Sequence, residues 1–202
     1  MMTQREKIST CLTLLLIVLL LPGCAGTVKN MRSVSPEQIV TVPEEGKSMV
    51  VFMRPSTFGF AIQSSVFEIQ EDSPSLVGIV AAKTKVAYQL EPGEHLFMVV
   101  GESADFMTAE LEANRTYYAL VTPRMGAWKA RFSLKPIHAT ELGSSQFTEW
   151  IEACDWVEKT AASENWANEN MVSIQQKEKK YWETWMGKDV SERPKLLPPD
   201  GK

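Results

Sequence analysis

Few side chains in this sequence of 202 residues are of the types that carry acid–base, nucleophilic or metal chemistry. The two histidines, His95 and His138, stand at no spacing typical of a catalytic triad or a metal site. A zinc site needs three or four ligands, and the obvious donors are these two histidines and Cys154. The sequence contains no GxGxxG motif, phosphate-binding loop or nucleophile elbow. We therefore expect structural roles for both histidines, no catalytic residues, no metal or soluble cofactor, and no enzymatic activity.

The motif Leu21-Pro22-Gly23-Cys24 stands at the end of an apolar run that covers residues 12–21. That run is too short to span a bilayer, which needs about 20 apolar residues. It fits the hydrophobic core of a secretory signal, and two basic residues precede it as such signals require. The four-residue motif resembles the lipobox that lipoprotein signal peptidase cuts. An ordinary signal peptide, cut after Ala25, is the alternative.

The lipobox resemblance implies that residues 1–23 are a signal peptide and that Cys24 becomes the first residue. Its sulfur would carry a diacylglyceryl group and its amine an acyl chain such as palmitate. Two or more chains anchor a protein stably, at about 0.8 kcal/mol for each buried CH2 group. Ala25 stands where an Asp would suggest retention in the inner membrane. We therefore expect an outer-membrane lipoprotein that faces the periplasm, with the inner membrane or the cell surface as alternatives.

Removal of the signal would leave 19 basic and 24 acidic residues, a net charge of −5. No basic stripe is present, and we therefore expect no nucleic-acid partner. Cys154 would then be the one cysteine left without a lipid or an intramolecular partner. We expect it to be a small buried residue of the core. An interchain disulfide and a reactive thiol stay open as alternatives.

Residues 48–137 contain short runs of β-branched, aromatic and Met residues between turn residues, at intervals of about 8–12 residues. This pattern is typical of an antiparallel β-sandwich, and we expect about seven or eight strands in an Ig-like or prealbumin-like arrangement. In one strand, Phe67 and Ile69 are predicted to face the core, and Glu68 and Gln70 the solvent. Residues 91–94, Glu-Pro-Gly-Glu, predict a type II turn.

The segment before this domain, residues 24–47, is rich in Ser, Pro and Glu and has little periodicity. We expect a lipidated N-terminus and a tether that holds the domain away from the membrane surface. Within it, Ile39, Val40 and Val42 predict a short edge strand. The last segment, residues 188–202, contains three prolines and is predicted to be a disordered tail.

Residues 144–187 change to a helical period and form the predicted α-helical, Trp-rich extension. One stripe recurs at helical spacing, and a second helical stretch begins near Ser163 and stops at Gly187. The two stretches could be two helices or one bent helix. The residues of the first stripe are Phe147, Trp150, Ile151, Cys154 and Val157.

Five of the six tryptophans lie in this extension. We expect them to pack the helices onto the sheet. The functional alternative is an interaction surface, through which the C-terminal helices would contact an envelope protein or the membrane interface. The residues that would form it are Trp156, Tyr181, Trp182 and Trp185.

Four segments of the β region resemble the DUF2846 family, a bacterial lipoprotein family of unknown function. They are residues 50–55 (VVFMRP), 90–95 (LEPGEH), 116–118 (TYY) and 131–136 (RFSLKP). The resemblance spans about 90 residues and excludes the segment after residue 143. It implies a compact periplasmic β-domain behind a lipid anchor, and it implies no reaction and no catalytic residues.

These observations predict a lipid-anchored protein of the cell envelope with a structural or protein-interaction role. The alternative is a module that binds a small ligand or a glycan in a groove lined by Phe58, Phe60 or Trp128. A hydrolase is the least expected function, because a histidine would have to meet both a carboxylate and a nucleophile.

Overall fold

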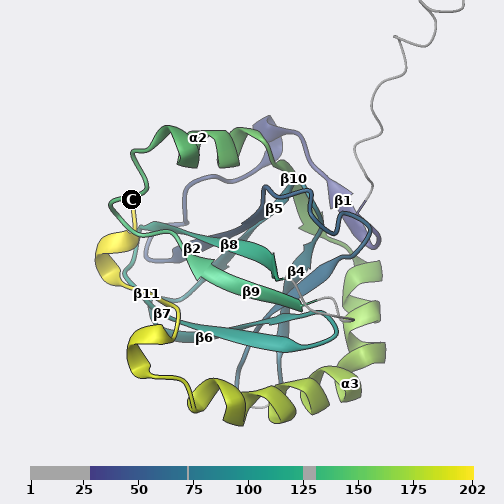
Figure 1. Ribbon diagram of the computed structural model, residues 1–202. Helices are drawn as coiled ribbons and strands as arrows, with labels where there is room; N and C mark the ends of the chain where they lie inside the picture. The colour runs from purple at the N-terminus through teal and green to yellow at the C-terminus, as the bar shows by residue number, and fades with distance from the viewer. Residues whose placement is uncertain (1–27, 72, 125–130) are drawn as a thin grey trace, which may run out of the picture.

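A computed structural model describes residues 28–71, 73–124 and 131–202, which are mainly β (Figure 1). The predicted signal peptide, the lipobox-like motif with Cys24, and Trp128 lie outside the described residues. The described strands form two sheets. Within the same residues, no helix has both the length and the apolar character needed to cross a membrane.

One sheet has six strands and the other has five. The six-stranded sheet has the order β1 (Met31–Ser33), β10 (Asp155–Lys159), β5 (Thr84–Leu90), β2 (Ser48–Arg54), β8 (Thr116–Arg124) and β9 (Arg131–Pro136). The five-stranded sheet has the order β11 (Lys195–Leu196), β7 (Ala104–Leu111), β6 (Gly93–Val100), β3 (Ser64–Glu68) and β4 (Ser75–Val80).

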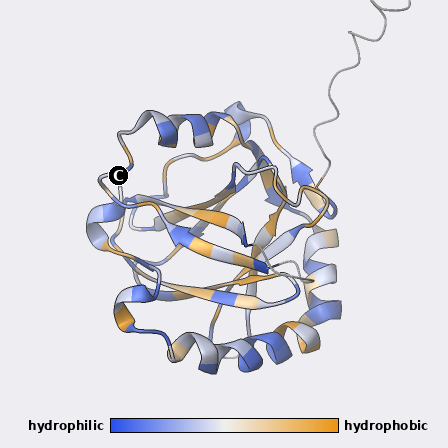
Figure 2. Cartoon of the chain, in the orientation of Figure 1, coloured by the Kyte–Doolittle hydropathy of each residue, from blue (hydrophilic) through white to orange (hydrophobic). Residues whose placement is uncertain are grey.

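Two α-helices lie on opposite sides of the strands in Figure 1. They are α2 (Ser145–Glu152) and α3 (Ala161–Met186), and three short 3-10 helices complete the fold: η1 (Pro36–Gln38), η2 (Val190–Glu192) and η3 (Pro198–Asp200). Orange concentrates on the strands in Figure 2, whereas α3 alternates between polar and apolar turns. The helices thus cover outer faces of the sheets.

Three apolar clusters hold the two sheets and the two α-helices together. The largest lies between the sheets, where the rings of Phe52 and Phe97 meet edge to face at 5.0 Å. A second cluster joins Phe106 on β7 to Trp185 on α3, and a third joins Tyr118 on β8 to Phe147 on α2. Every residue of β2 is therefore buried, because this strand has the other sheet on one face and α2 on the other.

The predicted all-antiparallel pairing is wrong in three places. The pairs β2–β8, β10–β5 and β11–β7 are parallel. A parallel pair needs a long crossover connection, and each of these pairs joins strands that are far apart in the chain. The hairpin neighbours β6 and β7 are antiparallel, as a short connection requires.

The predicted helical stripe of residues 147–157 is wrong in its second half. Helix α2 ends at Glu152, and Cys154 is followed by strand β10, which lies between β1 and β5. Strand β10 alternates in the pleat, with Val157 buried in the inter-sheet cluster. Thr160 then caps α3 in a capping box with Ser163, so the N-cap is Thr160 and the two helices are separate.

The predicted disordered tail is also wrong. Strand β11 pairs with β7, and Leu196 is fully buried in the inter-sheet cluster. At Gly201 an added Cβ would lie 2.7 Å from the Tyr117 ring, so this position fits only a glycine. The prolines of this segment end regular structure locally, but they do not prevent the segment from packing.

Part of the predicted tether belongs to the folded domain. Val28 is buried in the inter-sheet cluster, and β1 pairs with β10 at the edge of the six-stranded sheet. The edge strand therefore lies at Met31–Ser33, whereas Ile39, Val40 and Val42 lie in no strand. The segment satisfies its backbone by pairing with β10, which sequence periodicity had not identified as a strand.

Candidate functional site

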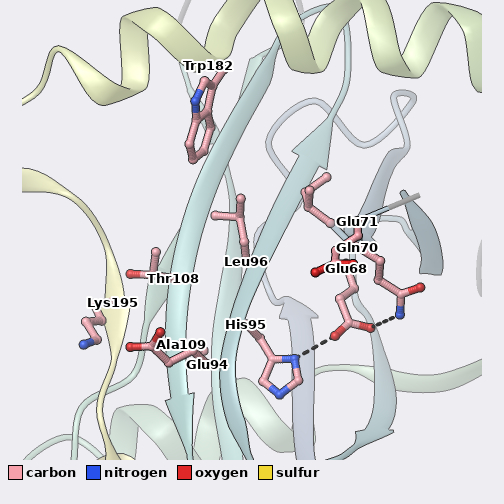
Figure 3. Close-up of a pocket in the computed structure, with 11 residues that line it drawn as sticks. Glu68, Gln70, Glu71, Glu94, His95, Leu96, Thr108, Ala109, Trp182 and Lys195 are labelled. Carbon is pink, nitrogen blue, oxygen red and sulfur yellow. Dashed lines mark hydrogen bonds and ion pairs between the residues drawn. The ribbon is translucent and has the colours of Figure 1, made fainter. Parts of the chain in front are cut away.

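A cleft of about 590 Å³ opens on the five-stranded sheet, next to the C-terminal strand β11 (Figure 3). Strands β3, β6 and β7 supply its floor, and α3 and β11 supply two walls through Trp182 and Lys195. A second cavity of about 450 Å³ lies beside it. The two cavities share Glu68, Gln70 and His95, which therefore form the partition between them.

Glu68 is the centre of this partition and is buried. Its carboxylate accepts hydrogen bonds from three side chains: His95 Nδ1 at 2.7 Å, the Tyr88 hydroxyl at 2.7 Å and Gln70 Nε2 at 3.0 Å. Tyr88 comes from the six-stranded sheet, so the network joins both sheets. The prediction that Glu68 faces solvent is wrong, because both faces of β3 are interior. Val66, on the same face as Glu68, points between the sheets, and Phe67, on the other face, packs in the cluster beneath α3.

His95 contacts an acceptor with each ring nitrogen. Nδ1 lies 2.7 Å from Glu68 Oε1, and Nε2 lies 2.9 Å from the backbone oxygen of Glu91. Both nitrogens must carry a proton to satisfy two acceptors, which makes the ring an imidazolium. The hydrogen bond from His95 lowers the pKa of Glu68, and the same bond raises the pKa of His95.

The turn of residues 91–94 positions this histidine. Gly93 has a φ of +134°, so the chain turns back through a conformation that favours glycine. The turn brings the Glu91 oxygen to Nε2 and starts β6 with His95 on its inward face, where the ring stacks 6.2 Å from Phe97. The sequence predicts a change of chain direction here, but neither the start of β6 at Gly93 nor the carboxylate that the histidine meets.

This network is poorly suited to acid–base catalysis. A general base needs a free lone pair within reach of substrate, and both nitrogens of His95 are occupied. Burial is the main cause of the raised pKa of Tyr88, which stays protonated and donates to Glu68. Within residues 28–71, 73–124 and 131–202, no group of three or more His, Cys, Asp or Glu side chains is placed to hold a metal ion.

His138 has a separate structural partner. Its Nδ1 lies 3.1 Å from Asp200 Oδ2, and the same carboxylate accepts the backbone N–H groups of Ala139 and Leu197 at 2.9 Å. Asp200 is buried, so it fastens the C-terminal segment to the linker that follows β9. The structure thus places the two histidines in different networks.

Cys154 lies buried beneath α2, as expected for a core residue. Burial raises the pKa of its thiol to about 11, although the nearby Lys85 opposes this shift. The thiol is therefore protonated at neutral pH and is a weak nucleophile. Lys85 itself donates to the backbone oxygen of Ile151 and lies 4.7 Å from the Trp156 ring centre.

The four aromatic residues predicted as an interaction surface do not form one patch. Trp156 packs with the cluster beneath α2, whereas Tyr181, Trp182 and Trp185 pack with the cluster beneath α3. Trp185 is buried, stacks on Trp182 at 5.2 Å and donates its indole N–H to the Phe106 oxygen. The packing interpretation is confirmed for Trp185, and Trp182 also lines the cleft.

Phe58 and Phe60 stand exposed on the loop of residues 55–63, and Trp128, the third residue of the predicted groove, lies outside the described residues. The loop is held by Arg54, whose role sequence reasoning missed. This side chain is fully buried and donates to the backbone oxygens of Phe58, Gly59 and Ile62 at 2.6–2.8 Å. The sequence feature that indicates this role is an arginine at the end of an otherwise apolar strand. A guanidinium buried there requires several hydrogen-bond acceptors nearby.

No protein-family model matches the chain, and no curated protein matches it. The resemblance to the DUF2846 family therefore stays a prediction from the sequence.

Proposed function

We propose that this chain is a lipid-anchored, non-enzymatic protein of the bacterial cell envelope with a structural or protein-interaction role. It is attached through Cys24, at the outer membrane, and faces the periplasm. The lipobox-like motif at the end of a short apolar run supports this location. The relation of the β-domain to the DUF2846 family and to Ig-like or prealbumin-like sandwiches is part of the same proposal.

The state of His95 is the observation that carries the non-enzymatic part. In the network of His95 and Glu68 at the cleft, each nitrogen of His95 and the carboxylate of Glu68 are already hydrogen-bonded. Cys154 is buried, and its raised pKa keeps it a thiol. A reaction that used His95 or Glu68 would first have to break the contacts that join the two sheets.

The anchor is tested by substituting Cys24→Ala in the full chain. We expect the wild type in the membrane fraction with the mass of an acylated cysteine, and the variant in the aqueous fraction. An unmodified Cys24 in the wild-type protein would contradict the proposal. The control is Cys154→Ala, which leaves the motif intact and should stay in the membrane fraction.

We further propose that a protein partner contacts the outer face of the C-terminal helices. Val172 supports this choice, because it is 69% exposed in the middle of α3. A truncation after residue 143 is unsuitable as a test, since it would remove β10, β11 and both helices from the fold. Crosslinking in intact cells should instead compare Val172→Glu with Val190→Glu, a change at another exposed valine. A partner lost only with Val172→Glu supports the proposal, and one retained by both variants contradicts it.

The second candidate is a module that binds a small ligand or a glycan in the cleft. The half-buried Trp182 favours it, because this aromatic ring lines the same cleft as polar groups such as Glu94 and Lys195, and a sugar has both apolar and polar faces. Titration with envelope glycans should change the tryptophan emission of the wild type and not that of Trp182→Phe. An unchanged emission with the wild type would exclude this candidate for the glycans used.

A further inference from the structure

Three large apolar side chains are exposed together on the loop between β2 and β3. Phe58 is 54% exposed, Phe60 is 75% exposed and Ile62 is 43% exposed. They alternate along five residues, so the loop presents apolar groups at its surface. Such a group of exposed apolar side chains marks an interaction site.

The shape of this loop is built by the fold. The buried guanidinium of Arg54 lies 4.9 Å from the Phe132 ring centre and binds three carbonyl oxygens of the loop. Gly59 has a φ of +64°, a left-handed conformation that allows the chain to turn around the guanidinium. The loop therefore directs carbonyl groups inward and leaves the Phe58 and Phe60 side chains outside.

The proposed anchor lies very close to the folded domain. Val28 is 4% exposed in the inter-sheet cluster, and its oxygen accepts the Met31 N–H at the start of β1. Three residues, 25–27, separate Val28 from Cys24. Four peptide steps span at most about 14 Å, whatever conformation they adopt. A lipid on Cys24 would therefore hold the Val28 side of the domain against the bilayer.

A series of contacts places the apolar loop on the same flank as Val28. Strands β1 and β4 are edge strands of their sheets, and the Ile79 N–H on β4 donates to Met31 Sδ at 3.4 Å. Ile79 pairs with Ser65 on β3, and Ile62 precedes Ser65 by three residues. Three peptide steps span at most about 11 Å. The loop is therefore connected through β3, β4 and β1 to the segment that the lipid would hold.

We propose that the loop of residues 55–63 inserts Phe58, Phe60 and Ile62 into the interfacial region of the bilayer to which Cys24 is attached. This inference rests on the proposed lipid anchor. Aromatic side chains are favoured at the boundary between headgroups and acyl chains, where a shallow apolar surface is stabilised. The lipid supplies the membrane affinity, and the loop sets the orientation of the domain.

The orientation has a consequence for the cleft. Strand β3 leaves the loop at Ser64 and reaches the cleft at Glu68, at its other end. With the loop in the bilayer, β3 directs the cleft toward the aqueous compartment. The surface available to periplasmic partners or ligands is then the surface that carries Trp182 and Lys195.

The test uses the lipidated full chain in vesicles of phosphatidylethanolamine and phosphatidylglycerol. An environment-sensitive fluorophore is attached at Phe60→Cys or, as a matched control, at Val190→Cys, because Phe60 and Val190 are both 75% exposed. Cys154 is buried, and Cys24 is blocked by its lipid, so the new cysteine reacts. A spin-labelled lipid then quenches any fluorophore that enters the interface. We expect several-fold stronger quenching at position 60 than at position 190.

Equal quenching at the two positions would overturn the inference while leaving the anchor intact. Mass spectrometry of the same sample separates this result from failure of the anchor, since a lipid-free Cys24 overturns both. In intact cells, a fluorophore at position 60 that is shielded from water-soluble quenchers, although it is exposed in vesicles, would show that a protein covers the loop. That outcome also overturns insertion into the bilayer.

Discussion

Two buried charged side chains, Arg54 at the end of β2 and Glu68 at the end of β3, take their hydrogen-bond partners in different ways. Arg54 precedes the loop that leads into β3, and its hydrogen-bond partners are three backbone oxygens of that loop. Glu68 ends β3, and its partners are the side chains of Tyr88, Gln70 and His95. These hydrogen bonds offset part of the cost of burying each charge, and the Nε of Arg54 stays buried without a hydrogen-bond partner among the described residues.

The two charged side chains differ in the part of the structure that their hydrogen bonds hold in place. Backbone oxygens do not titrate, so Arg54 fixes the shape of one loop at any pH near neutrality. The partners of Glu68 come from both sheets and include an imidazolium, so this network joins distant elements and depends on protonation. The comparison therefore predicts a local, pH-independent role for Arg54 and a long-range, pH-dependent role for Glu68.

The largest effect is expected for Arg54→Met. The change leaves three carbonyl oxygens without their donor, which should lower the free energy of unfolding by about 3 kcal/mol. Urea denaturation measures this loss, and limited proteolysis should show faster cleavage within residues 55–63. The control is Arg131→Met at an exposed position, which should change stability by less than about 0.5 kcal/mol. Equal stability of the two variants would break the first half of the comparison.

The second effect is expected for Glu68→Gln. The amide keeps the size of the side chain but leaves the His95 imidazolium without its counter-ion, so we expect a loss of about 2 kcal/mol in urea denaturation. Glu71→Gln, at an exposed residue that lines the same cleft, is the matched control and should be close to neutral. A neutral Glu68→Gln would show that the ion pair makes no net contribution.

The stability of the protein is expected to depend on pH through His95 and Glu68, and not through Arg54. The folded state raises the pKa of His95 above its ordinary 6.5, so this stabilisation is complete below pH 6.5 and is lost as pH rises through the folded pKa. It lowers the pKa of Glu68 below 4.5, so that contribution is present above pH 4.5 and is lost as pH falls through the folded pKa. Thermal unfolding should therefore show greatest stability between these values, and His95→Gln should flatten the decline on the alkaline side. A wild-type profile identical to that of His95→Gln would contradict the proposed imidazolium.

The smallest effect is expected for Tyr88→Phe. The change removes one donor to Glu68 and leaves the ring in place, so we expect a loss of about 1 kcal/mol. Combined with Glu68→Gln in a double-mutant cycle, the two losses should not add, because the residues share one hydrogen bond. If the two losses in stability are strictly additive, Tyr88 stabilises the fold independently of Glu68.

Local patterns predict the elements that a continuous apolar run, a helical period or turn residues define. Strand β2 was predicted from a continuous apolar run, and α3 from its helical period and its stop at Gly187. The turn before β6 was predicted from Pro92 and Gly93. In each case the determining interactions lie within a few residues of one another.

Local patterns do not predict the elements whose structure depends on distant partners. Strand β10 forms because it fills a place between β1 and β5, and β11 forms because the edge of β7 is available. The inward direction of Glu68 depends on α3, which covers the opposite face of β3 and so makes both of its faces interior. Alternation within one strand cannot reveal a helix that arrives about 100 residues later in the chain.

The sequence by itself determined the mainly β character of this protein, the helical period near its C-terminus and the chemistry available to it, because periodicity, turn residues and residue types are local properties. Only the tertiary structure decided which charges would be buried together. It joined Glu68 to His95 and Tyr88 across two sheets, and it turned Arg54 inward to hold a loop with exposed aromatic residues. The physical reason is that a buried polar group takes its partners from whichever backbone or side chain the fold brings within hydrogen-bond distance.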